Sequence, residues 1–205
     1  MELDNKWILI ILLVSIFLLK APTLDLPYYW DEFNSVIPAA LHSYNYNFTP
    51  FVWEEGFGHP PFFYLILAFG YYLFGHSQVV SHVITVFFSF LAVYFTFLVG
   101  KELFNKKVGL IAGLLLLFMP LFFAQSGIAN LPIPSAALTM IALFFAIKKR
   151  FFLYELFGSF LVLTEERGIL LIPAILLAYF INEKKIDKKM FFYSIPLGIF
   201  FIWII

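Results

Sequence analysis

The sequence contains no cysteine and few charged residues. Without cysteine in its 205 residues, disulfide bonds and thiolate metal sites are excluded. Charged residues make up 13% of the chain, and 13 basic residues balance 13 acidic ones. Because the bases lie in short clusters and the net charge is zero, nothing indicates nucleic-acid binding. If the chain were a soluble domain, this composition would leave it too few polar residues to cover its surface.

The sequence is rich in long apolar runs. Hydrophobic residues make up 62% of the chain and aromatic residues 21%, which predicts an all-α integral membrane protein, organised as one module over residues 1–205. We expect about seven transmembrane helices, the first retained because no small-x-small cleavage site follows it. Since the last run reaches the final residue, the chain either stops at that helix or forms the front part of a longer protein. The runs are residues 7–19, 79–99, 108–124, 133–147, 151–163, 169–181 and 190–205.

The charges between these runs predict an orientation. The positive-inside rule places basic turns in the cytoplasm, so we expect a multi-pass plasma-membrane protein with a cytoplasmic N-terminus and its first loop outside. The basic turns contain Lys101, Lys106 and Lys107, then Lys148, Lys149 and Arg150, then Lys184, Lys185, Lys188 and Lys189. The other side carries Asp25, Asp31, Glu32, Glu54, Glu55, Glu165 and Glu166.

The first outer loop, residues 21–77, is expected to carry two short helices at the membrane surface. One covers residues 32–42, and the other, residues 62–74, follows Pro60 and Pro61. Counting the second as a span would reverse every later loop and place the lysine clusters outside. We therefore expect it to lie in the interface; the alternative is an eighth span that breaks the charge rule. Within the spans, Gly109, Gly113 and Gly158 are expected to allow close helix packing.

Two adjacent carboxylates, Asp31 and Glu32, open the outer loop's first helix. Carboxylates beside a bilayer are costly unless they are used, and such a group can act as a base or bind a divalent cation. A metal at this pair is left open; a site made of Asp31, His42 and His59 does not have a diagnostic spacing. Adjacent helical residues point about 100° apart, so the two carboxylates cannot share one role equally. For Asp31, the alternative is an N-cap.

Two further motifs place polar residues on the outer side. Proline is accommodated in a first helical turn, so Pro60 and Pro61 leave His59 at a helix start, where donors can face a lipid phosphate. The alternative is a histidine merely at the headgroup level. Arg167, in the turn of residues 163–168, can hold a phosphate or pair with its neighbours.

The order of these parts resembles the GT-C superfamily of polyprenyl-phosphate-sugar glycosyltransferases, in the branch of protein mannosyltransferases and aminoarabinose transferases. That family has an aspartate, often Asp-Glu, after the first span, then a His-Pro-Pro or Lys-Pro segment, a Lys-x-Leu-Phe turn and a Leu-Thr-Lys-Gly turn. No single motif is specific, but four in the right order are. The matches are Asp31-Glu32, His59-Pro60-Pro61, Lys101-Glu102-Leu103-Phe104 and Leu163-Thr164 with Gly168.

The resemblance implies sugar transfer at the outer membrane surface. A sugar on a polyprenyl phosphate would pass to a hydroxyl or amine acceptor, with Asp31 as general base beside Glu32. The leaving phosphate needs cationic donors, and the resemblance points to His59 and Arg167, with His82 where the family has an arginine. The sugar and the acceptor stay open.

The sequence also departs from the family pattern. Near Asn130, where the family has a second acidic residue, no acid is present, and the later turn has Glu165-Glu166-Arg167 before Gly168. A non-catalytic lipid-binding or scaffolding protein that kept the frame is therefore the alternative function. A transporter is a weaker third, because the spans contain almost no ionisable residue beyond His82.

Overall fold

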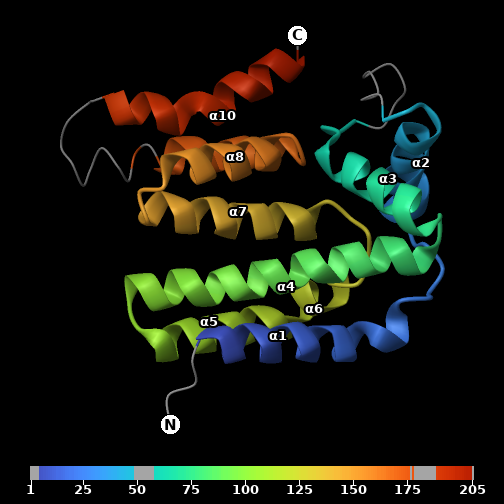
Figure 1. Ribbon diagram of the computed structural model, residues 1–205, viewed down its shortest axis with the longest axis horizontal. Coiled ribbons are helices and arrows are strands. Elements are labelled where there is room, and N and C mark those ends of the chain that lie inside the picture. Colours follow the sequence, from blue (N-terminus) through green and yellow to red (C-terminus); the bar gives the residue numbers. More distant parts are fainter. Residues whose placement is uncertain (1–4, 49–57, 176, 178–187, 205) are drawn as a thin grey trace.

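The computed structural model describes residues 5–48, 58–175, 177 and 188–204, and over these residues every regular element is helical (Figure 1). The all-helical prediction is thereby confirmed for the described part of the chain. The elements are α1 (Asn5–Lys20), η1 (Ala21–Thr23), η2 (Glu32–Val36), α2 (Ile37–Asn45), α3 (Phe62–Phe74), α4 (Gln78–Leu103), α5 (Lys106–Phe118), α6 (Pro120–Gln125), α7 (Pro132–Ile147), α8 (Phe151–Val162), η4 (Glu166–Leu170) and α10 (Lys188–Ile204). Predictions that fall on Glu54, Glu55, Lys184 and Lys185 lie outside the described residues.

The longer helices run alongside one another in the order α10, α8, α7 and α4, with α1 and α5 overlapping on the other side of α4 from α7; we call this array the helical layer (Figure 1). Helix α4 contacts α1, α5 and α7, while α8 packs between α7 and α10. α2 and α3 pack against each other at one end of the layer. At the opposite end, α4 turns into α5 and α7 turns into α8.

Among the residues that the structure describes, two helices are long and apolar enough to cross a membrane, over Lys6–Thr23 and Gln78–Leu103. The first combines α1 with η1, and the second is α4, whose N-cap Ser77 accepts a hydrogen bond from the Val80 amide. Helices α3, α7 and α8 are apolar but shorter. The predicted sixth run, residues 169–181, is described only through 175 and at 177.

The third predicted run, residues 108–124, was expected as one helix but is divided. It forms α5 and α6, with Met119 in an extended conformation between them. Pro120 explains the break, because proline lacks an amide hydrogen and disfavours helical geometry in the residue before it. The expected close packing at glycine is confirmed. A Cβ on Gly109 would lie 2.4 Å from the Phe97 carbonyl oxygen in α4, and one on Gly158 would lie 3.0 Å from Pro196 Cγ in α10.

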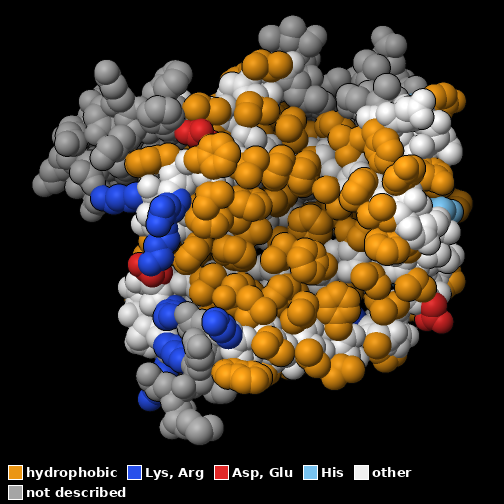
Figure 2. All heavy atoms as spheres, viewed as in Figure 1, with side chains coloured by type: hydrophobic (Ala, Val, Ile, Leu, Met, Phe, Trp, Pro, Cys, Tyr) orange, Lys and Arg blue, Asp and Glu red, His pale blue; other side chains and the backbone are white. Residues whose placement is uncertain are grey.

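The two ends of the helical layer differ in charge. Lys and Arg side chains gather at the end where α4 meets α5, and hydrophobic side chains cover most of the face between the ends (Figure 2). At the basic end, the Lys148 ammonium lies 2.6 Å from the Glu102 carboxylate, linking the end of α7 to the end of α4. The turns at residues 126–131 and 163–168 lie at the other end, with α2 and α3. This second end contains the candidate site.

The helix predicted at residues 62–74 begins and ends as expected, as α3. The prediction at 32–42 is also met, by η2 running into α2, although the helix continues to Asn45. Phe63, Tyr64, Leu67 and Tyr71 bury one face of α3. These two helices hold the residues that follow α1 over the end of α4.

Candidate active site

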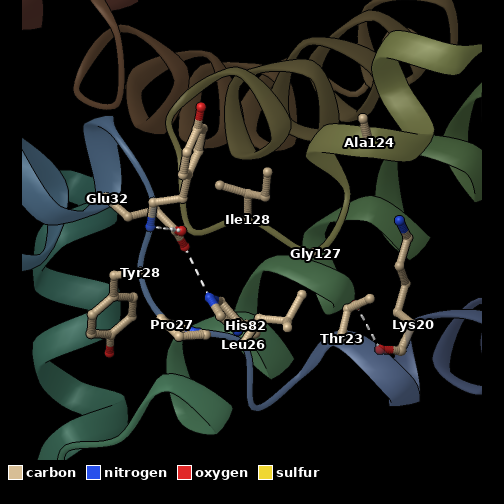
Figure 3. Close-up of a pocket in the computed structure, with 11 residues that line it drawn as sticks. Lys20, Thr23, Leu26, Pro27, Tyr28, Glu32, His82, Ala124, Gly127 and Ile128 are labelled. Atoms are coloured by element: carbon tan, nitrogen blue, oxygen red, sulfur yellow. Dashed lines mark hydrogen bonds and ion pairs between the residues drawn. The ribbon is translucent and has the colours of Figure 1, made fainter.

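A cavity of about 480 Å³ lies at the end of the layer that carries α2 and α3. Its walls come from the end of α1, the segment that follows it, the first turns of α4, and α6 with the segment after it. In Figure 3, Glu32 and His82 face each other at one side, and Lys20 and Thr23 stand at the other. The lining residues are Lys20, Thr23, Leu26, Pro27, Tyr28, Tyr29, Glu32, His82, Ala124, Gly127 and Ile128.

The Glu32 carboxylate is the most completely enclosed polar group of this cavity, with 1% of the residue exposed. Its Oε1 accepts a hydrogen bond from the Ala129 amide at 2.6 Å and lies 2.9 Å from Nε2 of His82. Its Oε2 accepts a bond from the Tyr29 amide at 2.9 Å. Three separate parts of the chain therefore meet on one carboxylate, which satisfies the rule that buried charges are paired and hydrogen-bonded.

His82 connects Glu32 to the segment after α1. Its Nδ1 donates to the Leu24 carbonyl at 2.9 Å, because a carbonyl oxygen can only accept. With Nδ1 carrying a hydrogen, Nε2 faces Glu32 Oε1, which also accepts from the Ala129 amide. This arrangement fits an imidazolium–carboxylate pair and fixes the ring between α4 and the segment that follows α1.

Asp31 has the opposite environment from its neighbour. It is exposed and occupies the N-cap position of η2, yet its side chain makes no capping hydrogen bond. The expectation that the two carboxylates point in different directions is met: Glu32 is buried and Asp31 is not. Trp30, just before them, has φ of +48°, a left-handed conformation that turns the chain into η2. Asp31 does not line the cavity, but it is bonded directly to a residue that does.

A set of hydroxyl groups fixes the segment between η1 and η2 onto α3 and α4. The Ser81 hydroxyl on α4 lies 2.9 Å from the Tyr28 hydroxyl and 2.8 Å from that of Tyr71 on α3. Burial raises the pKa of Tyr71 well above its usual value, so the phenol stays a neutral hydrogen-bonding group. Tyr28 also lines the cavity, so these bonds hold one wall of it in place.

His59 and Arg167 meet carboxylates in the turn after α8. His59 Nδ1 lies 2.9 Å from Glu166 Oε2, and Arg167 Nε lies 3.5 Å from Glu165 Oε1. Burial works to raise the pKa of Glu166, but hydrogen bonds from His59 and its own backbone, with the nearby positive charges, outweigh it and hold the pKa below its usual value. The Phe62 amide donates to the Leu163 carbonyl at 2.8 Å, so the start of α3 is tied to the same turn.

Lys20, the last residue of α1, was not recognised in the sequence as a site residue. Its ammonium donates to the Phe123 carbonyl and stands 3.8 Å from the centre of the Phe123 ring. Only 5% of the residue is exposed. A single lysine at the end of an apolar run is typical of a side chain that reaches toward the interface, so the sequence carried no signal of its burial.

The structure thus groups some predicted site residues and separates others. Glu32 and His82 share the cavity with Lys20, whereas His59 and Arg167 do not line it. Within the part of the chain that is described, no three His, Asp or Glu side chains are grouped so that they could hold a metal ion. The Ala129 amide, a main-chain donor, could not have been identified from its residue type.

Comparison with known proteins identifies the family. No curated protein matches the chain. The sequence model described as dolichyl-phosphate-mannose-protein mannosyltransferase matches residues 58–205, which is most of the chain. His82 and Ala129 lie inside this match, and Asp31 and Glu32 precede it. The chain therefore belongs to the dolichyl-phosphate-mannose-protein mannosyltransferase family, which makes it a membrane glycosyltransferase by family.

Proposed function

We propose that this chain transfers a sugar from a polyprenyl-phosphate donor to an acceptor at the outer membrane face, with Asp31 as the general base. The observation that carries the proposal is the contrast between two adjacent carboxylates. Glu32 is buried and accepts bonds from three parts of the chain, whereas Asp31 is exposed and makes no capping bond. A base must be free to take a proton from its substrate, and only Asp31 meets that condition.

In this proposal, Glu32 is a positioning residue. Successive Cα atoms are about 3.8 Å apart, so fixing Glu32 against His82 and the Ala129 amide also fixes the backbone that carries Asp31. The cavity beside Glu32, about 480 Å³, lies within the range of about 300–1,000 Å³ that is usual for small-molecule sites. The donor's head group would occupy it, and the acceptor would approach from the exposed side of Asp31.

The proposed membrane orientation follows from the two ends of the helical layer. The end with Lys101, Lys106 and Lys148 would face the cytoplasm, and the end with the cavity would face outward. We propose that the chain crosses the membrane seven times, with α2 and α3 at the outer surface. Helix α3 packs against α2 and against α4 at the end of the molecule that carries the cavity, which supports an interfacial position.

Substitution of the proposed base tests this function. Asp31→Asn is expected to lower the rate of sugar transfer by about 10²–10⁴-fold, because it removes the proton acceptor. Since Asp31 is exposed, the variant should fold and insert normally. Asp25→Asn is the matched control, because Asp25 is an exposed aspartate of the same outer segment. Transfer is measured with purified protein in lipid nanodiscs and a radiolabelled polyprenyl-phosphate sugar.

The result separates the transferase from the scaffold alternative. A normal rate of sugar transfer by Asp31→Asn would show that Asp31 is not the base. A wild-type protein that binds the donor but transfers no sugar to any hydroxyl or amine acceptor would support the non-catalytic lipid-binding function.

A further inference from the structure

The three cationic side chains expected to bind the lipid phosphate already have carboxylate partners. His82 pairs with Glu32, His59 with Glu166 and Arg167 with Glu165. The Arg167 side chain is also 77% exposed, so water screens its charge. A phosphate would have to compete with an existing carboxylate at each of these residues.

Lys20 differs from these three residues. Its ammonium has the Phe123 carbonyl and the face of the Phe123 ring as partners, and no carboxylate pairs with it in the described residues. An ammonium group has three donors, and the carbonyl takes one of them. A buried cation without a counter-charge is costly to keep, so this position favours an anion in contact with it.

The cavity lies beside this ammonium and is suited to an anionic head group. Thr23 and Gly127 line it next to Lys20. A Cβ on Gly127 would lie 3.3 Å from the Thr23 hydroxyl and 3.6 Å from Cδ of Lys20, so glycine leaves room where the lysine stem passes. Across the cavity, the bonds from His82, Tyr29 and Ala129 already occupy the Glu32 carboxylate. Its charge is therefore compensated locally and does not serve as the counter-ion of Lys20.

We infer that Lys20 binds the phosphate group of the polyprenyl-phosphate sugar in this cavity and stabilises the lipid phosphate as it leaves. This inference rests on the proposed function. In the transfer step, the acceptor oxygen forms a bond to C1 of the sugar, and the acceptor's proton passes to Asp31. The bond between C1 and the phosphate oxygen breaks, and its electron pair remains on that oxygen.

The charge change in this step explains why a buried ammonium is useful. A phosphodiester with one negative charge becomes a monoester whose charge approaches about two. A cation held in a site of low dielectric interacts more strongly with the product than with the donor, which lowers the barrier. The ring of Phe123 and its carbonyl hold the ammonium in position before the charge develops.

Lipid binding by charge variants tests the inference. Lys20→Met and Lys20→Gln are compared with wild type in nanodiscs for their affinity toward undecaprenyl phosphate and toward uncharged undecaprenol. Wild type should prefer the phosphate, and both variants should bind it about ten-fold or more weakly, which is the usual effect of losing a charge-assisted bond. The affinity for undecaprenol should not change. If Lys20 had a purely structural role, its substitution would weaken the binding of both lipids equally. Lys6→Met, at the exposed opposite end of α1, is the matched control and should bind as wild type.

The possible outcomes are distinct. Wild-type affinity for undecaprenyl phosphate in either charge variant overturns the inference, as does a wild-type protein that does not distinguish the phosphate from the alcohol. The latter measurement needs no variant to fold. If millimolar inorganic phosphate displaced the bound lipid, the site would be one for free phosphate, and the inference that it binds a lipid phosphate would be wrong. Lys20-dependent binding without sugar transfer refutes the proposed function alone, and unchanged transfer by Lys20→Met refutes the inference alone.

Discussion

The junction at Glu32 allows a stability prediction with a worked magnitude. Glu32→Ala removes the acceptor of the Tyr29 and Ala129 amides and the partner of His82. Removing one member of a buried pair costs about 3–5 kcal/mol of unfolding free energy. Glu32→Gln keeps the volume and one carbonyl oxygen, but its NH₂ group replaces an oxygen that accepts a bond. One donor loses its partner, which costs about 1–3 kcal/mol.

The expected order of stability is therefore wild type, then Glu32→Gln, then Glu32→Ala. Glu102→Gln is the control, because Glu102 forms a partly exposed pair with Lys148 and such pairs contribute about 1 kcal/mol or less. Unfolding by increasing SDS in mixed micelles, followed by circular dichroism, gives the free energies. A double variant with His82→Leu measures the coupling between the two side chains, expected at about 1–3 kcal/mol.

The reasoning would be refuted if the free energy of unfolding of Glu32→Ala lay within about 1 kcal/mol of the wild-type value, which is the contribution expected of an exposed pair. It would also fail if the alanine variant were no less stable than the glutamine variant, because the two bonds that glutamine keeps would then contribute nothing.

Two further predictions concern helix packing and pH. Gly109→Ala should destabilise the protein by about 1–3 kcal/mol, because the new methyl meets the Phe97 backbone; Gly198→Ala, which meets nothing in α10, should be neutral or stabilising in the same unfolding assay. Because the pKa of Glu166 in the folded protein lies below its ordinary value of 4.5, the stability from its bond to His59 is present above pH 4.5 and lost as the pH falls through the folded-state pKa. The stability difference between wild type and Glu166→Gln should therefore shrink between about pH 5 and about pH 3, and a constant difference would contradict this assignment.

Helix positions were the most predictable part of the fold. Apolar runs bounded by lysines and prolines predicted α1, α3, α4, α7 and α8 to within a few residues. These boundaries are predictable because they depend on the local sequence: a charged residue ends an apolar run, and a proline lacks the amide hydrogen that a helix needs. The division at Met119 was overlooked, although Pro120 stands in the sequence and gives the physical reason. The seven-span arrangement stays a prediction.

The site was only partly predictable. The sequence indicated that Asp31 and Glu32 would differ, because adjacent helical side chains diverge, but not which one would be buried. That depends on His82 and Ala129, which are 50 and 97 residues from Glu32 along the chain. The contact of Lys20 with Phe123 spans 103 residues. A single sequence carries no signal for such distant pairs, and a main-chain donor carries none at all. The roles predicted for His59, Arg167 and His82 at the lipid phosphate stay predictions.

The junction at Glu32 also has a consequence for biosynthesis. The carboxylate emerges near the start of translation, but the Ala129 amide becomes available only after α4, α5 and α6 have been made. A nascent chain released before residue 129 would leave Glu32 without one of its three partners, and a buried carboxylate that lacks a hydrogen-bond partner is costly. The cavity is therefore completed late, because Ala124, Gly127 and Ile128 in its wall are made long after Lys20 and Glu32.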